Sequence, residues 1–303
     1  MELNETLSEK RMLSMKVSVF VVTYNQERYI EQCLNGIASQ EVDFDYEVIV
    51  GDDCSTDQTG AICDLFAKNH PNFRIYHHPR NLGHVKNWEF VLNHCTGDYV
   101  AMVEGDDYWT DPHKLQRQVD FLETNQGFFL SFHRVKLVYD DAHHQQEHLF
   151  EHLEEREYTA REIYETWSVL TSSVVFRNNI GTIEFPNNVF YSDIYLFLIL
   201  MNHGRAWCHE MCSVAYRRHQ GNQSASQAFE PAAKLYEQYR VMEKAFPELH
   251  DITYQNKQHY LHLLAYNYLH EKKAVKYMFL YMAKHPAKLF SFRYWKRLVL
   301  NIF

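Results

Sequence analysis

Two pairs of neighbouring aspartates stand out as residues that could do chemistry together. Asp52-Asp53 and Asp106-Asp107 each follow an apolar run typical of a buried strand, and Glu104 comes two residues before the second pair. Gathering so many carboxylates in one crevice is unfavourable unless a positive charge joins them. A divalent cation held mainly by oxygen atoms, with a phosphorylated ligand completing its coordination shell, meets that need. We therefore expect these acids to form a site for a divalent metal and a phosphorylated ligand.

Each aspartate taken alone has a simpler explanation. A solvated loop position or a helix N-cap accounts for a single Asp, and Asp57 fits the N-cap well. Two adjacent pairs at equivalent strand ends favour the shared site. Other motifs for phosphate or metal fail: the sequence has neither G-x-G-x-x-G nor G-x-x-x-x-G-K-[ST], and Ser213 stands where H-E-x-x-H needs its second His.

The elements that must position the acids alternate along the first part of the chain. Strands are expected at 17–22, 46–50, 73–77 and 99–103, and helices at 26–40, 55–69, 84–94 and 112–123. The expected helix starts are Asn25, a Ser55-x-x-Gln58 capping box and Asp111. This alternation predicts an α/β fold with a doubly wound, mainly parallel sheet, in which ligands bind beyond the carboxyl ends of the strands.

The rest of the chain is less regular and then becomes helical. We expect strands at 128–138, 172–176 and 213–217, a polar, His-rich loop or short helix at 143–156, a short helix capped by Thr159 and Glu162, and a buried helix at 192–202. From about Phe229, apolar residues recur at helical spacing. These patterns predict an α/β domain at residues 16–225 and a helical extension at 226–303.

The net charge of −9 conceals an asymmetry. Residues 1–271 contain all 39 acidic residues and 22 of the basic ones, a formal charge of −17, whereas the remaining residues carry +8. An acidic body argues against nucleic-acid binding, which needs a basic field. The basic tail points to an anionic surface or to no specific partner.

Cysteine usage and hydropathy indicate a cytoplasmic protein. The six cysteines are scattered without a C-x-x-C pair, as expected of free thiols in a reducing compartment. The N-terminus lacks the pattern of a signal peptide. The most apolar later stretch, Tyr195–Met201, is far shorter than the ~20 residues of a transmembrane helix. We therefore expect a soluble or peripheral protein.

Three segments carry a family resemblance. They read VSVFVVTYN (17–25), YEVIVGDDCSTD (46–57) and GDYVAMVEGDDYWTDPHKLQ (97–116). In this order they resemble the family 2 glycosyltransferases, over about residues 16–225. The resemblance implies the GT-A fold and a hexosyltransferase-like enzyme that moves a sugar from a nucleotide-diphospho-sugar to an acceptor hydroxyl.

The resemblance also implies roles for particular residues. The donor would lie against Thr23, Tyr24, Asn25, Asp52, Asp53, Asn81, Gly83, Asn87, Glu104 and Asp106. Among these, Asp53 would bond the base and Asp106 would face the ribose, while Asp107 would hold Mg²⁺ or Mn²⁺ against the diphosphate. Glu104 stands where the family pattern has its first Asp, which keeps the charge and leaves its role open. Asn81 and Gly83 are equally explained by a plain turn before a helix.

Two later segments complete the implied site. In YSD, at the start of an apolar helix, Asp193 resembles the catalytic base that takes the proton of the acceptor hydroxyl. In YRRHQGNQS, which resembles a Y-R-x-H-x-G-x-x-S segment, His219 would complete the metal shell or touch the diphosphate. The alternatives are a helix-dipole role for Asp193 and a purely structural His219. Arg217 and Arg218 either neutralise phosphate or pair with surface acids.

The tail bears on the acceptor and the partners. Residues 286–303 place Trp and Phe on one helical face and Arg and Lys toward the other, so they either lie on an anionic membrane surface or pack on protein, including a second subunit. A homo-oligomer through the C-terminal helices is part of that second alternative. The Q-x-x-R-W motif and the membrane spans of processive polysaccharide synthases are absent from the sequence, which favours single additions.

We therefore expect an inverting, metal-dependent transfer from a UDP-linked sugar to a glycan or lipid-linked glycan acceptor. The expected setting is surface glycan assembly at the cytoplasmic face of the inner membrane. Two alternatives stay open. One is a sugar-nucleotidyltransferase, although its Gly-rich phosphate loop is missing near the first strand. The other is a non-catalytic protein that binds a nucleotide sugar.

Overall fold

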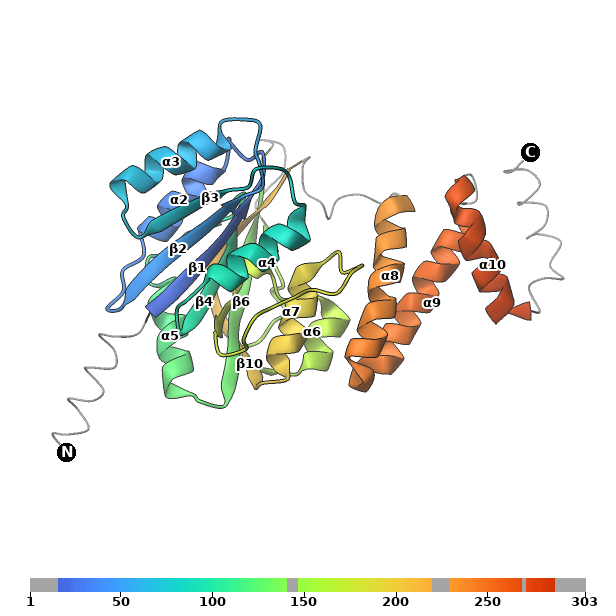
Figure 1. The fold of residues 1–303 in the computed structure, drawn as a ribbon. Helices are drawn as coiled ribbons and strands as arrows, with labels where there is room; N and C mark the ends of the chain where they lie inside the picture. Colours follow the sequence, from blue (N-terminus) through green and yellow to red (C-terminus); the bar gives the residue numbers. More distant parts are fainter. Residues whose placement is uncertain (1–15, 141–146, 220–228, 269–270, 287–303) are drawn as a thin grey trace. The chain divides into compact units, whose positions relative to one another are not determined.

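The computed structural model describes residues 16–140, 147–219, 229–268 and 271–286. The chain divides into two compact units (Figure 1). The first unit comprises residues 1–185 and 192–220, and the second comprises residues 186–191 and 221–303.

The first unit is built on one mixed sheet. Among the described residues its strand order is β3-β2-β1-β4-β9-β6-β10-β5, with β7 paired to β6 and β8 to β10. The strands are β1 (Lys16–Thr23), β2 (Asp45–Asp52), β3 (Phe73–His77), β4 (Tyr99–Glu104), β5 (Tyr108–Trp109), β6 (Phe128–Tyr139), β7 (Glu147–Leu149), β8 (Arg156–Tyr158), β9 (Val175–Arg177) and β10 (Arg205–Arg218). The helices are α2 (Ile30–Ala38), α3 (Thr59–Asn69), α4 (His84–His94), α5 (Lys114–Thr124), α6 (Ala160–Thr166), the 3₁₀ turn η1 (Thr171–Ser173) and α7 (Ser192–Met201).

Strand register brings the acids to one edge of this sheet. β1 runs parallel to both β2 and β4, with Thr23 opposite Asp52 and Val22 opposite Glu104. Because parallel strands end at the same edge, the first acid pair and Glu104 meet there, as the sequence predicted. The other half of the sheet is mixed: β9 runs antiparallel to both β4 and β6, β6 runs parallel to β10, and β5 runs antiparallel to β10.

Alternating side chains on β1 explain how helices cover both faces. Val17, Val19 and Val21 are fully buried in a core that they share with α2, α3 and α5. Phe20 points to the opposite face, where its ring packs edge-on against Trp88 of α4 with centroids 5.0 Å apart. Burying a side chain of this size contributes roughly 1.5–3 kcal/mol, so the strand that carries Thr23 to the site is firmly held.

The predicted start of the first helix is wrong. α2 begins at Ile30 and not at Gln26, because residues 26–29 form a separate turn. Asn25 adopts a positive φ of 52° and does not cap the helix. Its side-chain Oδ1 instead accepts the Thr56 N–H at 2.8 Å, which joins the loop after β1 to the loop after β2.

The capping box predicted at residues 55–58 is also wrong. Ser55 Oγ donates to Asp52 at 2.5 Å, and α3 begins only at Thr59. Asp57 serves this helix start, since its Oδ1 accepts the Thr59 N–H at 3.0 Å. Asp111 likewise accepts the N–H two residues ahead of it, and α5 begins three residues later than that aspartate.

The middle of the unit follows the prediction in part. Thr159 and Glu162 form the expected capping box at the start of α6. The segment predicted as strand at 172–176 begins as the 3₁₀ turn η1, and β10 extends further toward the N-terminus than predicted. The expected polar loop contains β7 and reaches β8, while residues 143–146 lie outside the described residues.

The second unit is helical, as the spacing of its apolar residues predicted. Its helices are α8 (Phe229–Ala245), the turns η3 (Pro247–Leu249) and η4 (Lys272–Ala274), α9 (His250–Tyr266) and α10 (Val275–Lys284). Their core includes Tyr236, Leu264 and Met278. Over the described ranges, no helix combines the length and the apolarity needed to cross a membrane. The amphipathic tail predicted at 286–303 lies outside the described residues beyond position 286.

Candidate active site

The first candidate feature is a group of carboxylates at the end of β4. Glu104 is the last residue of the strand, and the buried Asp106 and Asp107 follow in the turn. Burial raises the pKa of Glu104 well above its ordinary value, and the charges of Asp106, Asp107 and Asp193 add to the effect. Burial and the charge of Asp106 likewise raise the pKa of Asp107. The four acids thus lie within electrostatic reach of one another.

Asp107 has a hydrogen-bond donor on each carboxylate oxygen. Its Oδ1 accepts the backbone N–H of Arg217 at 2.9 Å, and its Oδ2 accepts the hydroxyl of Ser172 at 2.5 Å. The donors come from β10 and from η1, far from Asp107 in the sequence. Both bonds lower the pKa of Asp107, but they do not outweigh burial and repulsion. The carboxylate is therefore held in one orientation.

His219 contacts the same acid group through Asp106. Its Nε2 lies 2.9 Å from Asp106 Oδ2, and its ring packs on Tyr29 at a centroid distance of 4.7 Å. Arg217 points inward as well: its Nε donates to the backbone carbonyl of Asp106, and its guanidinium also donates to Gln32 Oε1. Arg217 therefore helps to shape the turn that carries the acids.

Asp193 lies in the first turn of α7 and is half-buried. Burial raises its pKa from 3.8 to about 6, although the backbone N–H groups of Asp193 and Ile194 oppose that shift. Its Oδ1 is buried and, among the described residues, has no hydrogen-bond partner. A carboxylate in this state has a free acceptor atom and a proton affinity suited to a general base near neutral pH.

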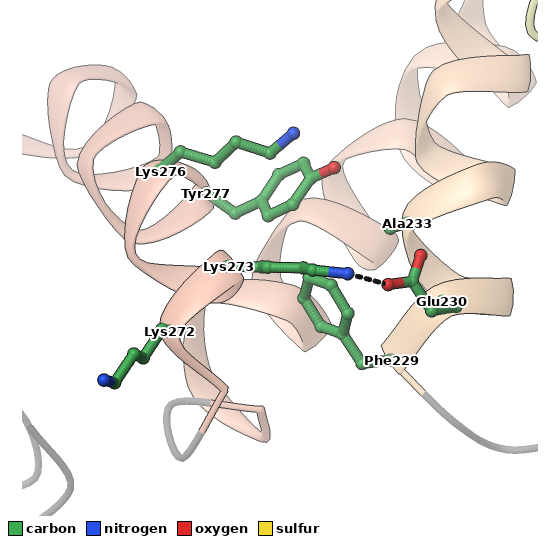
Figure 2. Close-up of a pocket in the computed structure, with 7 residues that line it drawn as sticks. All are labelled: Phe229, Glu230, Ala233, Lys272, Lys273, Lys276 and Tyr277. Carbon is green, nitrogen blue, oxygen red and sulfur yellow. Dashed lines mark hydrogen bonds and ion pairs between the residues drawn. The ribbon is translucent and has the colours of Figure 1, made fainter.

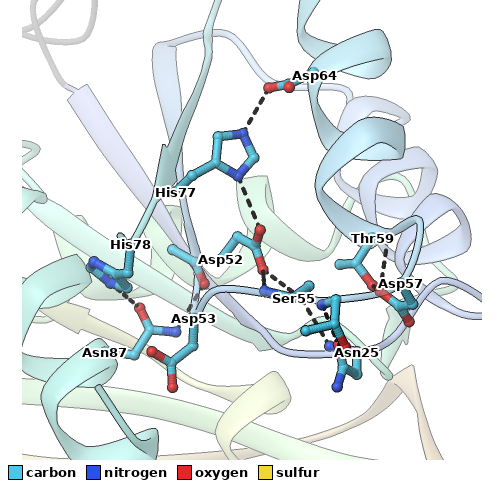
Figure 3. A network of polar contacts seen from close by, with 12 residues as sticks. Asn25, Asp52, Asp53, Ser55, Asp57, Thr59, Asp64, His77, His78 and Asn87 are labelled. Carbon is cyan, nitrogen blue, oxygen red and sulfur yellow. Dashed lines mark hydrogen bonds and ion pairs between the residues drawn. The ribbon is translucent and has the colours of Figure 1, made fainter. Parts of the chain in front are cut away.

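A second group of predicted residues lies at the ends of β2 and β3 (Figure 3). Asp53 accepts the Leu82 N–H at 2.7 Å and the Gly83 N–H at 2.9 Å, so it closes the loop before α4. Gly83 has a φ of +86°, which favours glycine. Asn81 supports the same loop, since its Nδ2 donates to the Asp53 carbonyl at 3.1 Å.

Asp52 and Asn87 are buried, and their side chains form polar contacts with other residues of the protein (Figure 3). Asp52 Oδ2 lies 3.0 Å from His77 Nδ1, and the other nitrogen of His77 lies 2.9 Å from Asp64. Asn87 Nδ2 donates to the Gly51 carbonyl at 2.9 Å, and its Oδ1 lies 2.9 Å from His78 Nε2. These contacts tie β2 to β3 and α4.

The loop after β1 places the three remaining donor-site candidates. Thr23 is buried, and its hydroxyl donates to Gln26 Oε1 at 2.8 Å. Tyr24 is exposed, and Asn25 is exposed with its side chain bonded to the next loop.

Three residues at the site have no place in the sequence prediction. Ser172 bonds Asp107, Gln26 bonds Thr23, and His84 opens α4 within electrostatic reach of Asp106. Burial lowers the pKa of His84 to about 4, although Asp106 opposes this, so its imidazole is neutral at pH 7. The sequence signal for His84 as a site residue is its position directly after the Asn81–Gly83 motif.

The donor set suits a hard divalent cation. Asp106 and Asp107 offer carboxylate oxygens, the ligands that Mg²⁺ and Mn²⁺ prefer. Each oxygen of Asp107 accepts one hydrogen bond from the protein, which leaves further lone pairs for a ligand. The repulsion that raises the pKa of Glu104 and Asp107 would be relieved by a positive charge. Within the described part of the chain, no three His, Cys, Asp or Glu side chains form a metal-binding group by themselves.

The second unit contains a pocket of a different character. Its volume is about 320 Å³, and its lining consists of Phe229, Glu230, Ala233, Lys272, Lys273, Lys276 and Tyr277. Lys273 donates to Glu230 at 2.7 Å, and Figure 2 shows the ammonium groups of Lys272 and Lys276 pointing in different directions. The pocket therefore lacks a converging set of charges, and the acid group of the first unit is the candidate active site.

Comparison with known proteins shows the family of the chain. The chain matches the model of the family "Glycosyl transferase family 2" over residues 18–179. An uncharacterised protein of Mycobacterium tuberculosis is 36% identical over 205 residues, which cover 67% of this chain and 59% of the relative. The chain thus spans about 59% of the length of that relative.

Two solved structures share the fold. The TarS 1-349 protein of Staphylococcus aureus in complex with UDP-GlcNAc has a TM-score of 0.61 at 24% identity, over 82% of this chain and 73% of that one. The full TarS protein is named as a poly(ribitol-phosphate) β-N-acetylglucosaminyltransferase. The mannosyltransferase PcManGT of Pyrobaculum calidifontis, in complex with GDP-Man and Mn²⁺, has a TM-score of 0.55 at 18% identity, over 99% of this chain and 91% of that one.

The family match covers more than half of the chain and includes most of β1, both acid pairs and Ser172. The mixed α/β architecture agrees with the fold of both solved structures. The chain belongs to glycosyltransferase family 2 and has the GT-A fold.

Proposed function

We propose that the chain transfers a sugar from a UDP-linked donor to a hydroxyl of a surface glycan or lipid-linked glycan, with inversion and one sugar at a time. The observation that carries this proposal is the convergence of Glu104, Asp106 and Asp107 with Asp193 at the edge of the sheet. Structural neighbours bind UDP-GlcNAc and GDP-Man, which supports a nucleotide-sugar donor and leaves the base to be tested.

The donor would lie across the two groups of site residues. Thr23 is the last residue of β1, and Asp53 directly follows β2. The nucleoside would bind beside these two residues, and Asp106 would face its ribose. Asp53 uses both carboxylate oxygens on the loop at Leu82 and Gly83 but keeps lone pairs for a base N–H. It would therefore hold the loop and read the base together.

Asp107 and His219 would hold a divalent metal beside the donor diphosphate. When bound, such a cation offsets the charge that develops on the departing nucleoside diphosphate. The neighbour that contains Mn²⁺ supports this expectation. Asp106 lies 2.9 Å from His219, so the residues proposed for the metal and the ribose are in direct contact.

Asp193 would remove the proton of the acceptor hydroxyl as its oxygen attacks the anomeric carbon. Its Oδ1, which has no hydrogen-bond partner in the described part of the chain, supports this role, and so does its pKa, which burial raises to about 6. The acceptor would be reached at an anionic membrane surface through residues 286–303.

The test is nucleoside diphosphate release by the purified chain with Mn²⁺ and either UDP-GlcNAc, UDP-glucose or GDP-mannose. We expect release by the wild type and a loss of at least ~100-fold in Asp107→Ala and Asp193→Ala. The exposed Glu31→Ala is the matched control and should keep the wild-type rate. Equal rates in all four proteins would refute the site. Pyrophosphate release would indicate a nucleotidyltransferase, and binding without turnover would indicate a non-catalytic protein.

A further inference from the structure

The orientation of Asp107 depends on a residue from a distant part of the chain. Ser172 is almost fully buried, and its hydroxyl lies 2.5 Å from Asp107 Oδ2, within the range of a charge-assisted O–H···O⁻ bond. The backbone N–H of Arg217 occupies the other oxygen at 2.9 Å. With one donor on each oxygen, the plane of the carboxylate is fixed before any ligand binds.

Ser172 is itself held in place by two long side chains. The indole Nε1–H of Trp109 donates to the Ser172 carbonyl at 3.1 Å, and the amide of Gln118 donates to the Ser173 carbonyl at 2.9 Å. Trp109 follows the acid turn by two residues and is buried against the ammonium of Lys114, 4.3 Å from its ring centroid. The turn η1 is therefore fastened to the same segment that carries Asp107.

We propose that Ser172 is a positioning residue that orients Asp107 toward a divalent cation, an inference that rests on the metal-dependent function proposed above. Each Asp107 oxygen keeps a lone pair for the cation after accepting its hydrogen bond. Groups that hydrogen-bond a metal ligand in this way typically change metal affinity by 10–100-fold when they are removed. Ser172 touches neither donor nor acceptor in this role, and it acts only through Asp107.

Ser173→Ala is a matched control for Ser172→Ala. Both serines are buried in η1, but the Ser173 hydroxyl donates to the carbonyl of Leu170 and not to an acid. Ser172→Ala removes the bond to Asp107 and a longer contact in which the Ser172 hydroxyl accepts the Glu104 N–H at 3.5 Å, whereas Ser173→Ala removes one bond to a neutral carbonyl. Both variants therefore lose a buried hydroxyl and its hydrogen bonding within the same turn. A purely structural role would therefore lower the thermal unfolding temperature of both variants and leave the Mn²⁺ affinity of the folded protein unchanged.

The experiment measures Mn²⁺ binding to the full chain by the electron paramagnetic resonance of free Mn²⁺, in the presence of UDP. We expect Ser172→Ala to raise the apparent Kd for Mn²⁺ by ~10–100-fold and Ser173→Ala to change it less than ~3-fold. Nucleoside diphosphate release should then recover in Ser172→Ala at high Mn²⁺, with the half-saturating Mn²⁺ concentration shifted by the same factor. Thermal unfolding checks that both variants are folded.

Trp109→Phe is a second variant for the case in which Ser172→Ala does not fold. It keeps a buried ring but removes the N–H that fixes Ser172, and we expect a rise of ~3–10-fold in the Kd for Mn²⁺. If the wild type binds Mn²⁺ and the variant that folds binds it equally well, the role of Ser172 is refuted while the proposed function stands. If the wild type binds no Mn²⁺, both the role of Ser172 and the metal-dependent step are refuted.

Discussion

Asp193→Asn should abolish transfer and at the same time stabilise the protein. Burial raises the pKa of Asp193 from 3.8 to about 6, which corresponds to about 3 kcal/mol against the ionised form. The side chain is half-buried, so solvent screening reduces this figure, and we expect about 1–2 kcal/mol. Asn keeps the shape and removes the charge, but it cannot accept a proton from the acceptor.

The pH dependence of this effect follows from the direction of the shift. A folded-state pKa above the unfolded value means that the stability contributed by protonated Asp193 is fully present below about pH 4 and lost as the pH rises through about 6. The gain in Asp193→Asn should therefore appear at pH 8 and vanish near pH 4. Urea unfolding at the two pH values measures the gain, and nucleoside diphosphate release at pH 8 should fall by at least ~100-fold.

Glu162→Gln is the control, and its effect on the free energy of unfolding should have the opposite sign to that of Asp193→Asn. The Thr159 N–H and Arg156 lower the pKa of Glu162 in the capping box of α6, so removing this charge should destabilise the protein at pH 8 and leave transfer unchanged. The role of Asp193 as the base is refuted if Asp193→Asn keeps transfer within ~10-fold of the wild type. The claim that the ionised Asp193 side chain costs stability is refuted if Asp193→Asn is equally destabilised at both pH values.

Two further outcomes follow from the same site. The transfer rate should decline as the pH falls through about 6, because Asp193 then becomes protonated, and a pH–rate profile at saturating Mn²⁺ measures this. Gly105→Ala should raise the KM for the donor and lower the free energy of unfolding by about 1–3 kcal/mol, as donor titration and urea unfolding would show. The added Cβ would lie 2.9 Å from Thr23 Oγ1 and 2.5 Å from Gln26 Oε1, and the short Thr23 side chain has little room to move.

The first half of the site was predictable because its signals are local. An apolar run followed by an acid pair marks both a strand and its carboxyl end, and the register of β1 with β2 and β4 then brings Asp52 and Glu104 to one edge. The helix starts were harder to predict, because polar side chains there have alternative partners. Asn25 bonds Thr56, which lies 31 positions away, and no pattern near Asn25 indicates that contact.

Ser172 shows what the sequence could not reveal. The stretch T-S-S-V-V-F suits a strand by its apolar residues, and its polar start carried no sign of a contact with Asp107, 65 positions earlier. The contact exists because β9 returns antiparallel beside β4, which brings η1 under the acid turn. The order of the strands in the sheet, and not the local pattern, decides which hydroxyl meets which acid.

The hydrogen-bond donors around Asp107 do not remove the electrostatic repulsion within the acid group. The Ser172 hydroxyl and the Arg217 N–H stabilise the carboxylate, yet its pKa stays well above the ordinary value because burial and Asp106 dominate. Neutral donors fix the direction of a charge without cancelling it. A bound cation would favour the ionised form of these acids, and a cation that binds only the folded state adds stability of about 2.7 kcal/mol at a concentration 100 times its Kd. In the proposed function, the metal-free fold would carry the cost of burying these acids near one another, and the bound cation would relieve it.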